Sequence, residues 1–100
     1  MSKSYYSDYA KHCLRFYVRH PNPRFHSMCD RRDWESAEGA LHALSAEDRD
    51  FLMEVYRAKG GKFEDRAKEI AERMDYRPKN RIWKTISRIE RDVAKRRGLI

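Results

Sequence analysis

The segment FEDRAKEIAERMDYRPKNRIWKTISRIERDVAKRR, residues 63–97, contains the pattern from which the architecture follows. Its second half places four apolar residues at intervals of four, three and four positions: Ile82, Ile86, Ile89 and Val93. This spacing predicts a helix over residues 78–97 that buries one narrow face. We expect Pro78 at the first helical position, where its missing N–H costs nothing, and we expect Gly98 to end the helix.

A shorter helix precedes this one. The first half of the segment gathers apolar residues on one side of a helix over residues 63–74: Phe63, Ala67, Ile70, Ala71 and Met74. Small alanines on that side let a neighbouring helix cross closely. The residues Asp75-Tyr76-Arg77 separate the two helices as a tight turn. Two helices joined in this way, the second of them basic, form a helix-turn-helix pattern.

The N-terminal part of the chain predicts two further helices. The first has its apolar stripe at Tyr6, Tyr9, Ala10, Cys13, Leu14 and Tyr17, and Pro21-Asn22-Pro23 ends it. Residues 24–32 are interpreted as a loop or a single turn. The next helix is expected to begin near Asp33, whose carboxylate can cap its first N–H groups. Its inner face is predicted to consist of Trp34, Ala37, Leu41 and Leu44.

Ser45-Ala46-Glu47-Asp48 is a capping signal that starts another helix. That helix buries Phe51, Leu52, Val55 and Tyr56, and Gly60-Gly61 terminates it. No stretch alternates as a strand does, so the predicted fold class is all-α: a small bundle of four to five helices containing a helix-turn-helix. We divide the chain into an N-terminal helical region of unassigned role, residues 1–43, and a helix-turn-helix region, residues 44–100.

Positive charge is concentrated at one end of the chain. The 100 residues contain 23 basic and 16 acidic side chains, which gives a net charge of +7. Residues 77–100 alone contain nine basic and two acidic side chains, a difference of +7. A basic chain favours polyanions, with nucleic acid first and an anionic membrane second. A solvated helix without a partner is the plainer alternative.

The side of the last helix opposite the isoleucines carries polar and charged residues: Asn80, Lys84, Ser87, Arg88, Arg91 and Lys95. In a helix-turn-helix the N-terminal part of the recognition helix meets base edges. We therefore predict base contacts from Lys79, Asn80, Arg81 and Lys84. Phosphate contacts are predicted for Arg77, Ser87, Arg88, Arg91 and Lys95. The implied partner is double-stranded DNA, read in the major groove.

Two segments also resemble a known family. Residues 44–56, which open with Leu44-Ser45-Ala46-Glu47-Asp48-Arg49, and residues 67–74, AKEIAERM, are similar to the C-terminal, region-four domain of bacterial sigma factors. Met74-Asp75-Tyr76 is closer to the sigma-like regulators of late genes in phages of Gram-positive bacteria. The resemblance covers residues 44–97. It implies a phage- or prophage-encoded transcriptional regulator that binds DNA near promoters and contacts RNA polymerase.

The chain departs from that family at the turn. Glycine is usual where Asp75 stands, and serine or threonine where Arg77 stands. When the standard motif is aligned on Ala71, its first buried position in the recognition helix falls at Arg81. In this chain the apolar residue is one position later, at Ile82. The turn is therefore predicted to be one residue longer than in the standard motif.

Other kinds of function have weaker signals. The residues Cys13, His20, His26 and Cys29 do not have the spacing of a structural zinc site. Gly60-Gly61 lacks the lysine and serine of a phosphate-binding loop. We expect no enzyme activity, no cofactor and no metal. Apolar runs are far shorter than the ~18 residues that span a bilayer, and no signal peptide is expected. Two cysteines without a secretion signal predict reduced thiols and a cytoplasmic location.

Two interpretations of the aromatic N-terminal helix stay open. Its residues Tyr5, Tyr6, Tyr9, Phe16, Tyr17 and Val18 either pack on the domain or form a partner surface, including that of a homodimer. Trp83 is interpreted as a residue at the rim of the core rather than one that stacks on bases. The alternative function is a small phage interaction module that binds RNA polymerase or another host protein instead of DNA.

Overall fold

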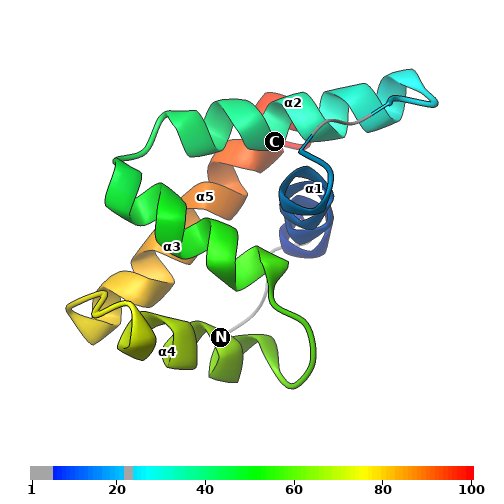
Figure 1. The fold of residues 1–100 in the computed structure, drawn as a ribbon. Coiled ribbons are helices and arrows are strands. Elements are labelled where there is room, and N and C mark those ends of the chain that lie inside the picture. Colours follow the sequence, from blue (N-terminus) through cyan, green and yellow to red (C-terminus); the bar gives the residue numbers. More distant parts are fainter. Residues whose placement is uncertain (1–5, 22–23) are drawn as a thin grey trace.

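The computed structural model describes residues 6–21 and 24–100, and this part of the chain contains five α-helices (Figure 1). The helices are α1 (Ser7–Arg19), α2 (Met28–His42), α3 (Ala46–Arg57), α4 (Phe63–Arg73) and α5 (Lys79–Arg97). None of the described residues lies in a strand. The predicted all-α class and the small helical bundle are confirmed.

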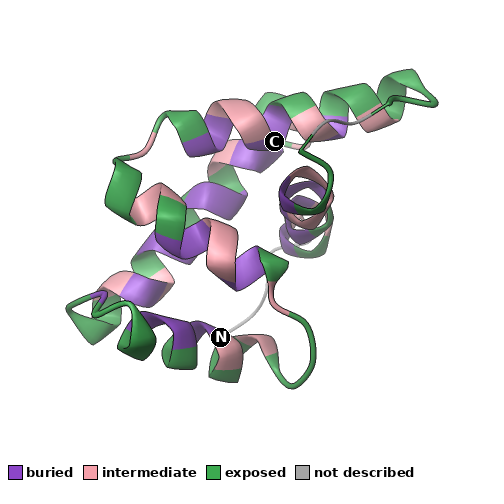
Figure 2. Cartoon of the chain, viewed as in Figure 1, coloured by how far each residue is buried: buried purple, intermediate pink, exposed green. Residues whose placement is uncertain are grey.

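The last helix, α5, is the element on which the others are assembled. It packs against α2, α1 and α4, and α3 packs against α1 and α4. Figure 1 shows α2 crossing the C-terminal half of α5, while α4 lies beside its N-terminal end. Figure 2 shows the buried side of each helix turned inward.

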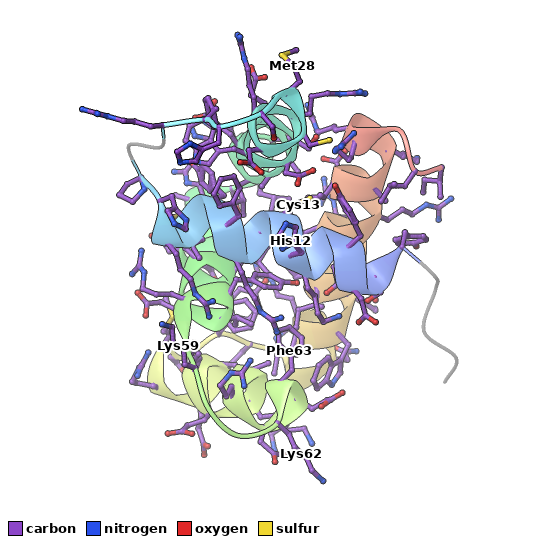
Figure 3. All side chains as sticks on the ribbon, turned by 90° about the vertical axis from the view of Figure 1, so that its right-hand side faces the viewer. His12, Cys13, Met28, Lys59, Lys62 and Phe63 are labelled. Atoms are coloured by element: carbon purple, nitrogen blue, oxygen red, sulfur yellow. The ribbon has the colours of Figure 1, made fainter. Side chains whose placement is uncertain are left out.

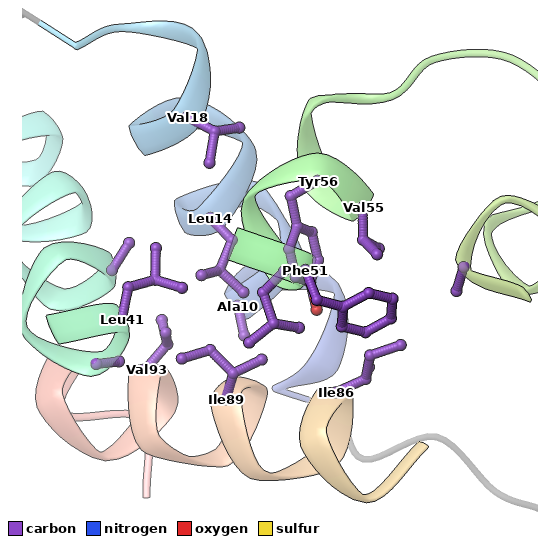
Figure 4. Packing of buried hydrophobic residues seen from close by; sticks show 14 of the residues in the cluster. Ala10, Leu14, Val18, Leu41, Phe51, Val55, Tyr56, Ile86, Ile89 and Val93 are labelled. Carbon is purple, nitrogen blue, oxygen red and sulfur yellow. The ribbon is translucent and has the colours of Figure 1, made fainter. Parts of the chain in front are cut away.

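One hydrophobic core joins all five helices (Figure 4). Each helix contributes residues that are almost completely inaccessible to solvent, among them Leu14, Leu41, Phe51, Ile70 and Ile89. The predicted inner face of α5 is buried along its whole length. Residues on both sides of position 43 share this core, so α1 packs on the helix-turn-helix region. Tyr5 of the aromatic segment lies outside the described residues.

The predicted start of α2 near Asp33 is wrong by five residues. The helix begins at Met28, and the Ser27 hydroxyl accepts a hydrogen bond from the Asp30 N–H at 3.1 Å. Ser27 therefore caps the helix. The first turns of α2 extend beyond the body of the molecule (Figure 1) and are largely exposed. Because they bury little, they have no apolar stripe from which the sequence could have predicted them.

The remaining boundaries agree more closely with the sequence. Ser45 caps α3 by accepting from the Asp48 N–H at 3.3 Å, as predicted. Gly98 has a left-handed φ of 85° and ends α5, also as predicted. Five residues, 74–78, separate α4 from α5, so the connection is longer than the expected three-residue turn. Pro78 has an extended ψ of 171° and precedes the helix instead of occupying its first position.

Among the described residues, no helix combines the length and the apolar character needed to cross a lipid bilayer.

Candidate nucleic-acid interface

Three polar clusters fix the rotation of α5 about its own axis. The first lies near its N-terminal end, where the hydroxyl of Tyr76 is hydrogen-bonded to Asp48 and, at 2.7 Å, to Thr85 of α5. The Tyr76 ring stacks on Phe51 with centroids 4.0 Å apart. Burial raises the pKa of Tyr76, and the hydrogen bond to Asp48 raises it further. The phenol therefore stays protonated and can donate to the carboxylate.

The second cluster surrounds Glu90 at the middle of α5, whose side chain is buried. Its carboxylate accepts hydrogen bonds from Ser7 at 2.7 Å and Tyr56 at 2.9 Å, and it pairs with the ammonium of Lys11 at 2.8 Å. Burial raises the pKa of Tyr56, with the Glu90 charge adding to the effect. A buried carboxylate with three donors is fully satisfied, and it ties α5 to α1 and α3.

The third cluster holds the C-terminal end of α5. The guanidinium of Arg97 pairs with buried Asp33 of α2 at 2.6 Å, and the Tyr9 hydroxyl donates to the same carboxylate oxygen at 2.7 Å. His12 of α1 lies 3.6 Å from the other oxygen. Asp33 therefore does not cap α2. It lies inside the helix, and its carboxylate pairs with Arg97.

With the rotation of α5 fixed in this way, six polar residues predicted from the sequence lie exposed on its outer side. They are Asn80, Lys84, Ser87, Arg88, Arg91 and Lys95, which we call the α5 outer face. At 1.5 Å per residue, its cations extend over roughly 16 Å, from Lys84 to Lys95. None of these four cations forms an ion pair with a residue that the structure describes.

Acidic groups beside the α5 outer face already have cationic partners. Asp92 pairs with Arg96 at 3.2 Å within the helix. Glu47 and Asp48, at the start of α3, both pair with Arg81, at 2.9 and 2.8 Å. The nearby carboxylates therefore do little to offset the positive charge of Lys84, Arg88, Arg91 and Lys95.

Three of the predicted contact residues lie away from this face. Arg81 is directed at α3, where its guanidinium also lies over the Tyr76 ring, 4.5 Å from the centroid. Arg77 is highly exposed in the connection before α5 and pairs with Asp75 at 2.6 Å. Lys79, exposed at the first turn of α5, lines a groove of about 540 Å³ between α4 and α5.

That groove contains one cation, Lys68, that was not among the predicted contact residues. Ile82 and Trp83 of α5 line it together with Lys68 of α4. Trp83 is partly buried against the core, which confirms its interpretation as a rim residue. Lys68 is exposed on α4, the shorter of the two helices that form the groove.

The four residues weighed as a zinc set have different environments. Cys13 is fully buried in the core, and burial raises the pKa of its thiol to about 12. His20, His26 and Cys29 are exposed. Within residues 6–21 and 24–100, no three His, Cys, Asp or Glu side chains converge in a way that could hold a metal ion.

No protein-family model matches the chain, and comparisons with curated proteins and with solved structures found no significant similarity. A functional assignment therefore depends on the α5 outer face and its surroundings.

Proposed function

We propose that the protein is a DNA-binding transcriptional regulator that places α5 in the major groove of duplex DNA. The observation that carries this proposal is the row of four cations on the α5 outer face, exposed and without an intramolecular ion pair in the described part of the chain. Like charges three or four residues apart on a helix repel one another by about 0.2–0.5 kcal/mol per pair, and a bound polyanion would relieve that repulsion.

The dimensions of α5 suit this role. The major groove is about 12 Å wide and admits one α-helix. A row of cations roughly 16 Å long extends over about five base pairs, since base pairs are stacked about 3.4 Å apart. Lysine and arginine that neutralise phosphates release condensed counterions, which supplies a sequence-independent affinity.

Two kinds of contact are assigned along the helix. Asn80 and Lys84, nearest its N-terminal end, are assigned to base edges, because an amide pairs with adenine and a lysine with guanine. Ser87, Arg88, Arg91 and Lys95 are assigned to phosphates, which position the helix. Arg81 is assigned to orienting α5 against α3. The transcriptional role rests on the resemblance of residues 44–97 to the sigma-factor domain.

The first test is fluorescence anisotropy with a labelled 20-base-pair duplex, using the double variant Arg88→Gln/Arg91→Gln. Removing two phosphate contacts should weaken binding and reduce the slope of log affinity against log salt by about 1.8, at about 0.9 per contact. The matched control is Lys59→Gln/Lys62→Gln, which loses the same charge from the exposed connection between α3 and α4.

The control should keep a salt slope close to that of the wild type. If both double variants weaken binding equally, only net charge matters, and the assignment of the α5 outer face is wrong. In vitro selection from a random duplex library then gives the preferred site. On that site, Asn80→Ala should cost about 1–3 kcal/mol and relax the base preference at one position.

A further inference from the structure

A row of aromatic rings runs along one side of α1, from Tyr9, which packs against the core, to the exposed rings of His12 and His20. Tyr9, His12, Phe16 and His20 follow one another at intervals of three or four residues, with ring centroids 5.8, 6.5 and 4.8 Å apart. Figure 3 looks directly onto α1, with His12 at the middle of the helix. Tyr9 packs against the core, but the other three rings of the row do not belong to the core, to which α1 contributes the buried residues Cys13 and Leu14.

Of the two central rings of the row, His12 is exposed and Phe16 is half-buried. His12 and Phe16 are nearly parallel, with 8° between their planes, and their centroids are 6.5 Å apart. The His12 side chain is 63% exposed. The ring faces thus suit a planar ligand.

The row continues past the end of α1. The indole N–H of Trp34 donates to the backbone carbonyl of His20 at 3.0 Å. This bond joins α2 to the residue that caps the C-terminal end of α1. Phe25, which is 38% exposed, lies edge-on to Trp34 with centroids 5.9 Å apart. We call these rings, His12, Phe16, His20, Phe25 and Trp34, the aromatic face.

Arginine predominates around the aromatic face, and two nearby carboxylates, Asp33 and Glu35, are paired with Arg97 and Arg31. Residues 12–32 contain five arginines, one aspartate and no lysine. Arg15 and Arg19 belong to α1 and Arg24 adjoins Phe25 in the chain, and none of the three forms an ion pair with a described residue. Arginine binds phosphate with a planar fork and also stacks on bases, which lysine cannot do. Arginines interleaved with rings are typical of surfaces that hold unpaired nucleotides.

We propose that the aromatic face binds single-stranded nucleic acid, with bases stacked on its rings and the backbone along Arg15, Arg19 and Arg24. Stacking needs bases that are not enclosed in a duplex, whereas the α5 outer face has charge and polar groups but no row of rings. The two faces are on different helices and are expected to select different forms of nucleic acid. This second activity does not depend on whether α5 reads duplex DNA.

The chain contains two tryptophans, and Trp34 is the one within the aromatic face. The variant Trp83→Phe therefore has a single tryptophan, at the proposed site, whose fluorescence can be excited selectively over that of the six tyrosines. Titration with a 15-nucleotide oligothymidylate at low salt should quench its fluorescence to saturation. An oligouridylate of the same length measures whether the sugar matters.

Two substitutions in this background test the site. His12→Ala removes an exposed ring and its 3.6 Å contact with Asp33, which keeps its partners Arg97 and Tyr9. Arg19→Gln removes an exposed cation, so neither substitution is expected to disturb the hydrophobic core. Each should weaken oligothymidylate binding by about tenfold, because stacking and charge each contribute on that scale. The control Arg88→Gln/Arg91→Gln should bind oligothymidylate within about twofold of the parent. Circular dichroism checks that every variant keeps its helix content.

Absence of quenching by either oligonucleotide at low salt would overturn the proposal and leave a protein as the occupant of this face. Loss of quenching in the α5 double variant, with His12→Ala unaffected, would also overturn it, because single strands would then bind at α5. Failure of duplex binding alone would count only against the function assigned to α5.

Discussion

Arg81 lies where α5 meets α3, and its guanidinium contacts Glu47, Asp48 and the ring of Tyr76. The sequence places Arg81 next to Asn80 and among other cations, so its charge suggests a base contact. Its two acidic partners are more than 30 residues earlier in the chain, and no local pattern indicates them. The exposed neighbours Asn80 and Lys84 are the better candidates for base readout, because their side chains have no such contacts in the described structure.

The contacts of Arg81 predict that it orients α5 against α3 and does not contact a base. Arg81→Ala should lower the melting temperature, because Asp48 and Glu47 lose their shared partner. It should leave the base preference on the selected duplex unchanged. Thermal unfolding followed by circular dichroism, together with competition between single-base variants of the duplex, measures both. A preference relaxed roughly tenfold at one position, with the melting temperature unchanged, would mean that Arg81 reads a base.

At the scale of elements, burial determined which helices could be predicted. In α1, α3, α4 and α5 the apolar stripe in the sequence coincides with the buried side of the helix. The periodicity of these stripes therefore located the four helices to within a few residues. The first turns of α2 are exposed and carry Cys29, Arg31 and Arg32, which have no such periodicity. Only the cap at Ser27 marked the true beginning of α2. The α5 outer face, which is polar in the sequence, is exposed in the structure.

The buried polar clusters could not be predicted from the sequence. Glu90 contacts Ser7 and Lys11, which are about 80 residues earlier, and Asp33 contacts Arg97, 64 residues later. An amphipathic pattern shows which side of a helix is buried but not which partners meet there. Glu90 is one residue before Arg91 and resembles part of a solvated helix surface in the sequence, yet it is buried and connects α5 to Ser7 and Lys11 of α1.

The Glu90 cluster gives a prediction about the stability of α5. Glu90→Gln removes the charge that compensates the ammonium of Lys11, whose side chain is only 10% exposed. An unpaired buried charge typically costs about 3–5 kcal/mol, and we expect the free energy of unfolding to fall by an amount approaching that range. Urea denaturation measures it.

The control for Glu90→Gln is the double variant with Lys11→Met, which removes both charges and keeps the length of the side chain. It should recover a large part of the lost stability, because no buried charge is then left without a partner. A double variant that is less stable than Glu90→Gln alone would show that the Lys11 ammonium is not held by Glu90.

For the molecule as a whole, buried thiol and phenol groups predict a loss of stability in alkaline solution. The pKa of Cys13 is raised to about 12, and burial also raises the pKa values of Tyr9, Tyr17, Tyr56 and Tyr76. Each group keeps its proton to higher pH in the folded state than in the unfolded state. Stability should thus be fully present below pH 9 and decline as the pH rises from 9 toward 12.

Cys13→Ala tests one part of this alkaline transition. The variant should be less stable at pH 7, because it leaves a small cavity in the core. Its free energy of unfolding should nevertheless decline less steeply above pH 9, by up to about 1.4 kcal/mol per pH unit. Cys29→Ser, at an exposed position, should follow the wild type. Equal slopes in all three proteins would contradict the burial of the Cys13 thiol.

The most direct measurement of what α5 does is an NMR titration of ¹⁵N-labelled protein with the selected duplex. Binding through the α5 outer face should shift the amide signals of Asn80, Lys84, Ser87, Arg88, Arg91 and Lys95 the most. Signals from the outward side of α1 should change little with duplex DNA. Shifts concentrated on α1 and α2, or none at low salt, would contradict the assignment of α5 to the major groove.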